Sequence, residues 1–365
     1  MKLSDFDFSL PEESIAVHPV EPRDSAKLLA ADRKTGKIIH SHFYDLPNFL
    51  KKDDFLVFNS SKVIPARLFG KVGAKEIEIL LTSPCHSELN SESSFIDIDS
   101  GSESGMTANV WRVMAKPGKK LKAGSIIEFN EHLLARVAKA ENGIFQIQFN
   151  ICDKDFWHEI EKIGEMPLPP YILKKRHEKH DEKVDRQDYQ TIYADKPGSV
   201  AAPTAGLHFT DELMKKIKAK GCETGFVDLH VGLGTFEPIR TENIEDHTMH
   251  SEHFELSKDL ADRLNRAKKE GRRIIAIGTT SVRVLESCQK NGILAPKSGE
   301  TDIYIYPGYK FRFVDGMITN FHLPKSSLLL LVSAFWSGEK VLEAYQTAIK
   351  RNYRFYSYGD GMFIV

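Results

Sequence analysis

The chain has 365 residues, which is enough for two or three domains and for a substantial hydrophobic core. Hydrophobic residues make up 41% of it and charged residues 28%, as is typical of a soluble globular protein. The 50 Lys and Arg residues nearly balance the 51 Asp and Glu residues, and this balance excludes a globally cationic surface. A nucleic-acid partner would therefore have to meet a local basic patch, because electrostatic affinity depends on how charge is distributed.

The N-terminal segment and the cysteines bear on where the protein works. Residues 1–8 lack the apolar region of a signal peptide, and the longest apolar run, at 327–336, is too short to span a bilayer. The cysteines lie far apart, without a Cys-x-x-Cys motif or a metal-ligand spacing, at Cys85, Cys152, Cys222 and Cys288. We expect reduced, structural thiols in a cytoplasmic protein.

Two alternating segments near the N-terminus predict a β-hairpin. Apolar residues alternate with polar ones at 27–32 and 38–43, and the sequence Lys-Thr-Gly-Lys at 34–37 supplies the turn. A compact apolar run, Phe-Leu-Val-Phe-Asn at 55–59, then predicts a buried strand.

Short alternating segments follow one another in the next part of the chain, with turns between them and hardly any helical period. They lie at 67–72, 75–81, 110–114, 125–129, 135–140 and 144–149. Strands at this spacing are typical of a small antiparallel β-barrel, so we predict an inserted barrel domain over residues 66–150. Residues 84–109, which interrupt it, are rich in Ser, Glu and Gly and are predicted to be a flexible insertion.

Beyond the barrel, helical and strand patterns alternate. Helices are predicted at 153–163, 210–220, 257–270, 281–289 and 326–336, strands at 223–231 and 273–278, and an exposed loop at 174–188. The tyrosine-rich segment 353–364 is interpreted as a strand packed in the core. Alternating helices and strands indicate a parallel or mixed sheet with helices on its faces. The predicted fold class is therefore α/β, with a main α/β/α layered domain (residues 1–65 and 151–365) that carries the inserted six-stranded antiparallel β-barrel.

Three turns follow predicted strands of the main domain, where open α/β sheets place their ligands. In the first, Thr204 and His208 lie among small residues that let the backbone approach a ligand, although a loop with a helix cap explains the pattern equally well. In the second, the backbone N–H groups of Gly232 and Gly234, with Thr235, could cradle a ribose or a carboxylate. A tight turn or bulge after the strand is the alternative there, and it stays open.

The third turn carries a stronger signal. Thr279, Thr280 and Ser281 stand at the start of a predicted helix, whose free N–H groups favour an anion or a ligand carboxylate. Ordinary N-capping needs only one hydroxyl. Three in a row beside Arg283 therefore favour ligand binding.

Three histidines cluster with acidic residues at 245–253. The spacing of His247, His250 and His253 matches neither a helical His-Glu-x-x-His pattern nor a Cys/His finger, so we predict no metal site. Hydrogen bonding or acid–base work is the preferred interpretation, because histidine titrates near neutral pH.

As a set, these motifs resemble the S-adenosylmethionine:tRNA ribosyltransferase-isomerase family. The resemblance rests on ordered segments at 5–8, 21–24, 63–68, 201–210, 229–236, 244–252, 278–283, 300–309, 319–326 and 353–360. It covers nearly the whole chain apart from residues 84–109, and such a long ordered match is far more specific than any single motif. One departure is Ser60, which stands where the family usually has an aspartate.

The resemblance implies a reaction that no spacing could show. Members of the family transfer the ribosyl group of S-adenosylmethionine to 7-aminomethyl-7-deazaguanine at the wobble position of tRNA and isomerise it. The product is epoxyqueuosine, and adenine and methionine are released. By resemblance, we expect this tRNA as a partner and S-adenosylmethionine as a consumed co-substrate, with no cofactor and no membrane. The protein is expected to act as a monomer.

The resemblance also directs the choice of site residues. Such a reaction needs a general base, a donor to adenine, and groups that fix methionine and ribose. The base and acid candidates are His208, His230 and His322. The residues expected to bind substrate are Thr204, Gly232, Gly234, Thr235, Thr279, Thr280, Ser281, Arg283 and Asn320. The residues expected to contact the tRNA backbone are Arg23, Lys62, Arg67 and Lys325.

Two other functions remain as alternatives. The glycine turn after the 223–231 strand faintly resembles that of S-adenosylmethionine-dependent methyltransferases, but Pro238 interrupts the helix that should follow. An RNA-binding module without catalysis would need a basic face, and the balanced charge counts against it. Free adenine as a product would support the transferase-isomerase, whereas S-adenosylhomocysteine would support methyl transfer.

Overall fold

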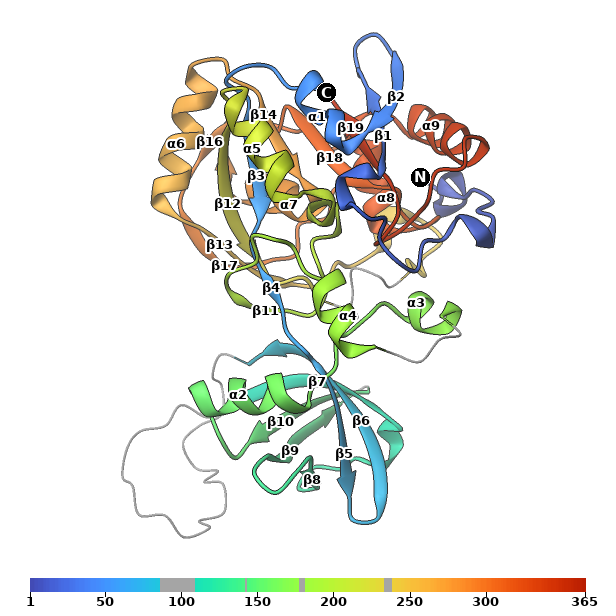
Figure 1. Ribbon diagram of the computed structural model, residues 1–365. Coiled ribbons are helices and arrows are strands. Elements are labelled where there is room, and N and C mark those ends of the chain that lie inside the picture. Colours follow the sequence, from blue (N-terminus) through green and yellow to red (C-terminus); the bar gives the residue numbers. More distant parts are fainter. Residues whose placement is uncertain (86–108, 142, 177–180, 233–237) are drawn as a thin grey trace. The chain divides into compact units, whose positions relative to one another are not determined.

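The computed structural model describes the whole chain except residues 86–108, 142, 177–180 and 233–237. The described residues form two compact units. We call them the main unit, residues 1–63 and 168–365, and the barrel unit, residues 64–167. The chain thus leaves the main unit after Val63 and returns to it at Leu168 (Figure 1).

The main unit is built around one mixed sheet (Figure 1). Nine described strands form it in the order β17-β13-β12-β3-β14-β18-β19-β1-β2. In chain order they are β1 (Lys27–Ala31), β2 (Ile38–His42), β3 (Phe55–Asn59), β12 (Glu223–Leu229), β13 (Glu252–Leu256), β14 (Ile274–Ile277), β17 (Lys297–Thr301), β18 (Gly316–Asn320) and β19 (Gly361–Ile364). Two small pairs accompany the sheet: β4 (Lys62–Val63) with β11 (Pro197–Ser199), and β15 (Gln289–Lys290) with β16 (Ile293–Leu294).

Neighbouring strands at the centre of this sheet run parallel. β12 pairs with β3, β3 with β14, and β14 with β18, each in parallel register. Their carboxyl ends therefore lie along one edge of the sheet, which we call the carboxyl edge. The predicted N-terminal hairpin is confirmed, because β1 and β2 pair antiparallel, and β3 is the predicted buried strand.

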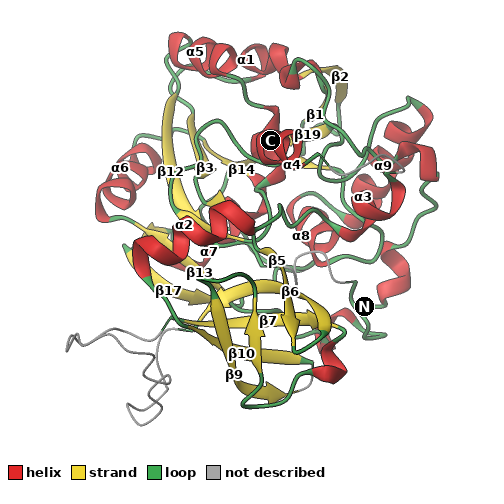
Figure 2. Cartoon of the chain, turned by 60° about the horizontal axis from the view of Figure 1, so that its bottom comes forward, coloured by secondary structure: helices red, strands yellow, loops and turns green. Residues whose placement is uncertain are grey.

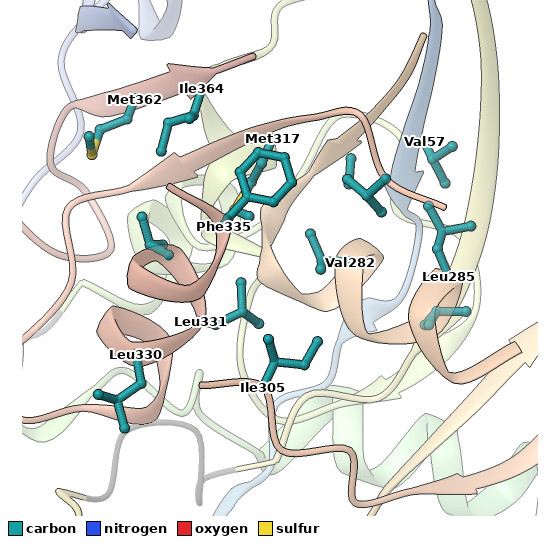
Figure 3. Close-up of a cluster of buried hydrophobic side chains, with 14 of the residues drawn as sticks. Val57, Val282, Leu285, Ile305, Met317, Leu330, Leu331, Phe335, Met362 and Ile364 are labelled. Carbon is teal, nitrogen blue, oxygen red and sulfur yellow. The ribbon is translucent and has the colours of Figure 1, made fainter. Parts of the chain in front are cut away.

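Helices cover both faces of the sheet, because its central strands are apolar on both sides. In β3, Phe55 and Val57 belong to one core cluster, whereas Leu56 and Phe58 belong to the other. The first cluster, part of which is drawn in Figure 3, includes residues of α6 (Lys258–Lys269), α7 (Gly278–Cys288), α8 (Ser327–Phe335) and α9 (Gly338–Lys350). The second includes residues of α1 (Leu46–Phe49) and α5 (Asp211–Ala219). The predicted α/β/α layering is confirmed.

Helix starts agree with the sequence at most positions. Side chains cap α5, α6 and α8 as residue types at these positions predict, and the caps are Thr210, Ser257 and Ser326. Helix α7 differs, because it begins at Gly278 and not at 281. Gly278 has φ +85°, a left-handed conformation that lets the chain pass directly from β14 into the helix.

The predicted exposed loop at 174–188 is wrong for its later part. Residues Glu182–Asp188 form α4, with Asp181 as the N-cap, and Pro170–Lys175 form α3. The carboxylate of Asp185 is buried and pairs with Arg176. Some charged residues of this segment therefore form a buried ion pair, Arg176 with Asp185, and are not all on the surface.

The barrel unit contains the predicted antiparallel barrel (Figure 2). Six described strands close it in the order β10-β7-β6-β5-β8-β9. They are β5 (Arg67–Val72), β6 (Lys75–Pro84), β7 (Val110–Lys116), β8 (Ile126–Glu128), β9 (Leu134–Glu141) and β10 (Ile144–Phe149). Alternate residues face the interior, as Ile77, Ile79 and Leu81 of β6 do.

Helix α2 (Asp153–Ile163) belongs to the barrel unit, although we predicted residues from 151 onward in the main domain. Phe156 of α2 packs against Phe149 of β10 and Trp111 of β7, with ring centroids 4.9 and 5.7 Å apart. This aromatic contact attaches the helix to the barrel. Most of the predicted insertion at 84–109 lies outside the described residues.

Short 3₁₀ helices and the C-terminal segment complete the fold. The 3₁₀ helices are η1 (Leu3–Phe6), η2 (Glu12–Ser14), η3 (Arg23–Ser25), η4 (Phe43–Asp45), η5 (Gly118–Lys120), η6 (Thr204–His208) and η8 (Ile244–Asp246). The tyrosine-rich segment packs in the core as predicted, since Tyr353, Tyr356 and Tyr358 are buried and β19 follows them. Among the described helices, none combines the length and the apolar character that a membrane crossing requires.

Candidate active site

The carboxyl edge of the main sheet brings together polar residues that are far apart in the chain. Asn59 ends β3, His230 follows β12, Gly278 follows β14, and Asn320 ends β18. Open α/β sheets bind ligands at this edge, at the point where the chain connections diverge to opposite sides. In the strand order β12-β3-β14-β18, these four carboxyl ends are neighbours.

Thr204, His208 and Asn320 form one hydrogen-bond network. The Oγ1 of Thr204 donates to Oδ1 of Asn320 over 3.0 Å. The Nδ2 of Asn320 donates to Nε2 of His208 and to the carbonyl of Tyr356, both over 3.2 Å. Elements η6 and β18 hold these groups, and His208 and Asn320 are buried. Thr204 and His208, which were predicted in one turn, thus lie together with Asn320, which was predicted in another segment.

His208 is held as a neutral imidazole. Its ring stacks on Phe43, with centroids 4.0 Å apart and an angle of 19° between the planes. Burial lowers the pKa of His208 to about 3, because it desolvates the charged ring, and the positive charges of Arg354 and Arg23 act in the same direction. The residue is therefore a weak base near neutral pH, suited to hydrogen bonding and ring packing.

His322 is also buried and neutral. Its Nε2 lies 2.8 Å from the hydroxyl of Thr319, and its backbone N–H donates to the hydroxyl of Tyr345 in α9. Burial lowers the pKa of His322 to about 3. It makes no hydrogen bond or ring contact with His208 or His230 in the part of the chain that the structure describes.

His230 is the most accessible of the three candidate histidines, with 20% of its side chain exposed. Its Nε2 lies 3.4 Å from Oδ2 of Asp228, two residues earlier on the same face of β12. Its ring centroid is 5.4 Å from that of His253 in β13. The Nδ1 atom is buried without a hydrogen-bond partner among the described residues. This histidine therefore has one ring nitrogen near a carboxylate and the other without a hydrogen-bond partner among the described residues.

The glycine turn after β12 is only partly described. Gly234 and Thr235 lie outside the described residues, so their role stays a prediction. The backbone N–H of Gly232 donates to Oε1 of Glu252 in β13 over 2.9 Å. A ribose or carboxylate bound by Gly232 would have to displace Glu252.

Arg283 was expected to hold a ligand carboxylate, but a carboxylate of the protein occupies it. Its Nη1 binds Oε2 of Glu252, and its Nη2 donates to the carbonyl of Thr301 over 3.4 Å. Both charged side chains are buried, at 4% and 5% exposure. A buried guanidinium needs such an anion. Arg283 therefore links α7 to β13 through this ion pair.

The hydroxyl groups in the first turn of α7 have different surroundings. The Oγ of Ser281 donates to the carbonyl of Ile277 over 2.8 Å, so this hydroxyl serves the helix and not a ligand. The Oγ1 of Thr280 is buried without a hydrogen-bond partner among the described residues. No side chain at the N-cap position bonds to the first N–H groups of α7. The predicted anion site is therefore reduced to Thr279, Thr280 and these N–H groups.

Two of the residues predicted to contact tRNA are held by internal contacts. Arg23 is largely buried and donates to the backbone carbonyls of Gln187 and Gln190. Arg67, within the barrel unit, pairs with Glu78 and Glu165.

The two lysines predicted to contact tRNA are each partly exposed. Lys325 has 43% of its side chain exposed, and its Nζ lies 2.5 Å from Asp7. Lys62 lies in β4 and is half-buried. The four residues therefore differ in exposure, and the side chain of Lys325 is more exposed than those of Arg23 and Arg67.

Two acidic residues of this region escaped the sequence analysis as site residues. Asp228 contacts His230, and Glu252 joins Gly232 to Arg283. The only available signal was alternation, which puts residues two apart on the same face of a strand. No group of three or more His, Cys, Asp or Glu side chains among the described residues is placed to hold a metal ion.

Comparison with known proteins decides the family. The family described as "Queuosine biosynthesis protein" matches residues 3–364. The chain belongs to this queuosine biosynthesis family. The match runs through both the main unit and the barrel unit, so each is part of the family's common structure.

Relatives within the queuosine biosynthesis family agree with this over their full length. The chain is 48% identical to the S-adenosylmethionine:tRNA ribosyltransferase-isomerase of Desulfitobacterium hafniense, covering 100% of both sequences. It is 47% identical, with the same coverage, to the protein of that name from Halothermothrix orenii. A crystal structure of S-adenosylmethionine tRNA ribosyltransferase from Thermotoga maritima shares 34% identity and a TM-score of 0.54, covering 99% of this chain and 100% of that one. The resemblance seen in the motifs is confirmed.

Proposed function

We propose that the chain is an S-adenosylmethionine:tRNA ribosyltransferase-isomerase, the name its full-length relatives carry. The observation that carries the proposal is identity of 48% and 47% over the whole of both chains. The polar carboxyl edge of the main sheet supports it, because such an edge is where an α/β enzyme binds its substrate.

The finer proposal concerns the substrates and products. The ribosyl group of S-adenosylmethionine goes to 7-aminomethyl-7-deazaguanine at the wobble position of tRNA and is isomerised. Epoxyqueuosine forms, and adenine and methionine leave. Because S-adenosylmethionine is consumed, the proposal includes no resident cofactor. We also expect the enzyme to be a monomer and to act in the cytoplasm.

His230 is the proposed acid–base residue. The reaction must remove a proton from the carbon beside the sulfonium and must supply a proton to the departing adenine. His208 and His322 are poor bases, since the pKa of each is about 3. His230 is partly exposed and has a carboxylate at 3.4 Å. His208 and His322 act in this proposal as neutral hydrogen-bonding groups.

The first turn of α7 is the proposed site of the methionine carboxylate. Its N–H groups have no N-cap side chain, and the positive end of the helix dipole attracts an anion. Thr280 adds a hydroxyl whose oxygen has no hydrogen-bond partner among the described residues. Thr204 and Asn320, joined to each other on the neighbouring strand end, are the proposed contacts of the nucleoside part.

The tRNA backbone is proposed to meet Lys62 and Lys325, whose side chains are accessible in part. Replacing a lysine that contacts phosphate should weaken binding and flatten its salt dependence. Arg23, Arg67 and Lys325 would each first have to release a present partner. The side chains of Arg23 and Arg67 are the less exposed of these, so their replacement should act mainly on stability.

The test is incubation with S-adenosylmethionine and tRNA that carries the deazaguanine precursor, followed by nucleoside mass spectrometry. Epoxyqueuosine together with free adenine and methionine is the expected result. S-adenosylhomocysteine with a methylated nucleoside would indicate methyl transfer instead. Unchanged precursor tRNA would overturn the proposal.

A further inference from the structure

Asp228 is unusual among the acidic residues near the carboxyl edge. Only 9% of its side chain is exposed, and its Oδ1 has no hydrogen-bond partner among the described residues. Burial disfavours an ionised carboxylate unless positive charge lies close by. The positive groups near it are Lys196, which interacts with it electrostatically, and the imidazole of His230 when that ring is protonated.

His230 is held in place from its other sides. Its backbone N–H donates to the carbonyl of His253 over 2.9 Å, and the two rings pack against each other. Gly198 in β11 has φ +148°, and a Cβ at this position would lie 2.4 Å from Cε1 of His230. The ring therefore occupies space that any larger residue at 198 would fill. In this orientation Nε2 faces Asp228.

We propose that Asp228 is a positioning residue for His230, an inference that rests on the proposed function. With Nε2–H directed at the carboxylate, the lone pair lies on Nδ1, which is buried and has to become accessible before it takes up a proton. The negative charge of Asp228 then stabilises the imidazolium that forms. Orienting carboxylates act in this way beside catalytic histidines in other enzymes, by fixing the tautomer and stabilising the charged ring.

Other titratable groups face this pair from neighbouring elements. In β13, His253 lies 3.5 Å from Glu300 of β17, and Glu255 lies 2.5 Å from Lys196. Glu255 is directly opposite Asp228 in the register of β12 and β13, but it is exposed and bound to the lysine. It is therefore a matched control, a carboxylate at the same level of the sheet that does not contact the histidine.

The first experiment compares Asp228→Asn with Glu255→Gln in the full chain, by the rate of adenine release from S-adenosylmethionine with precursor tRNA. We expect D228N to lower kcat by about tenfold or more while both KM values stay within about twofold. E255Q should stay within about twofold of the wild type in all three constants.

A double variant tests whether the two residues act as one unit. In the background of His230→Gln, D228N should cause no further loss of kcat. Additive losses would overturn the proposal, and so would a folded D228N protein with wild-type kcat.

A measurement on the wild-type protein does not depend on whether a variant folds. Nitrogen NMR of protein labelled with 15N-histidine reports which ring nitrogen carries the proton. The signals of His230 are assigned as those that are missing from the spectrum of H230Q. We expect it on Nε2, toward Asp228, and a proton on Nδ1 would overturn the inference. If the wild type releases no adenine but the proton lies on Nε2, the proposed function fails and the orientation of His230 by Asp228 stands.

Discussion

The hydroxyl of Thr204 and the side-chain carbonyl of Asn320 are joined by a 3.0 Å hydrogen bond across 116 residues of sequence. The amide nitrogen of Asn320 donates in turn to His208 and to the backbone of Tyr356. One buried amide therefore ties η6, β18 and the segment before β19 together. Removing it leaves several buried polar groups without partners at once.

Asn320→Ala should destabilise the protein by about 1–3 kcal/mol, since His208 and Thr204 lose their partner in a buried environment. Urea denaturation followed by circular dichroism gives the free energy of unfolding. Asn243→Ala is the control, because Asn243 is exposed and its side chain donates to nearby Asp246, so its loss should stay within about 0.5 kcal/mol. Equal stability of the two variants would contradict the network.

The two buried histidines predict loss of stability in mild acid. The folded pKa of His208 and of His322 is about 3, against 6.5 for the free side chain. Between these limits the unfolded chain binds protons that the folded protein does not. Their contribution is thus complete above pH 6.5 and is lost as the pH falls toward 3, with a slope of at most about 1.4 kcal/mol per pH unit for each ring.

Urea denaturation across this pH range checks the slope. His322→Gln should reduce it, because glutamine takes up no proton in either state. His18→Gln, at an exposed position, should leave the slope as in the wild type. A slope unchanged in H322Q would show that the buried ring is not the source.

Gly198→Ala should impair catalysis by displacing His230, because the added Cβ would lie 2.4 Å from the ring. We expect adenine release to fall by about tenfold or more. Gly299→Ala is the matched control, since Gly299 has φ +154° but no neighbour within 4 Å of its Cβ position. Both variants carry similar backbone strain, so a comparable loss of activity in G299A would argue against the steric explanation.

Glu252→Gln should destabilise the protein by about 3–5 kcal/mol, because it leaves the buried guanidinium of Arg283 without its anion. Chemical denaturation measures the loss. Glu255→Gln on the same strand removes an exposed carboxylate paired with Lys196 and should change stability by about 1 kcal/mol or less. If E252Q were as stable as E255Q, the Arg283 ion pair would not be structural.

Thr280→Val should weaken S-adenosylmethionine binding about three- to tenfold without loss of stability, since its hydroxyl oxygen has no hydrogen-bond partner among the described residues. Ser281→Ala should show the reverse, a lower stability with nearly unchanged affinity, because that hydroxyl bonds to Ile277. Isothermal titration calorimetry and denaturation separate the two effects. Unchanged affinity in T280V would remove this hydroxyl from the proposed carboxylate site.

Local patterns in the sequence predicted most of the fold. The alternation in β1 and β2, the apolar run of β3 and the helix starts at Thr210 and Ser257 each depend on only a few neighbouring residues. The barrel followed from the same alternation. Helix α4 was missed because Asp185 looked like a surface charge, and only its contact with Arg176 reveals it as buried.

The candidate site was less predictable, because long-range pairing decides which polar groups are free. Nothing next to Arg283 in the sequence shows that Glu252, on another strand, neutralises it. Likewise, the sequence did not show that α7 begins at Gly278. Because it does, Ser281 lies inside the helix, where its hydroxyl donates to the carbonyl of Ile277. Asp228 was missed as well, although the period of two along a strand puts it on the same side of the chain as His230.

The position of β19 in the sheet has a consequence for how the protein is made. This strand lies between β18 and β1 and pairs with both, and the backbone of Lys27 bonds to Asp360, 333 residues away. On the ribosome, the barrel unit is contiguous and can fold as soon as residues 64–167 have emerged. The β1–β2 hairpin must wait until β19 is translated, with one open edge exposed to other chains. Nascent copies of this protein should therefore depend on chaperones late in synthesis, and most strongly just before residue 361 appears.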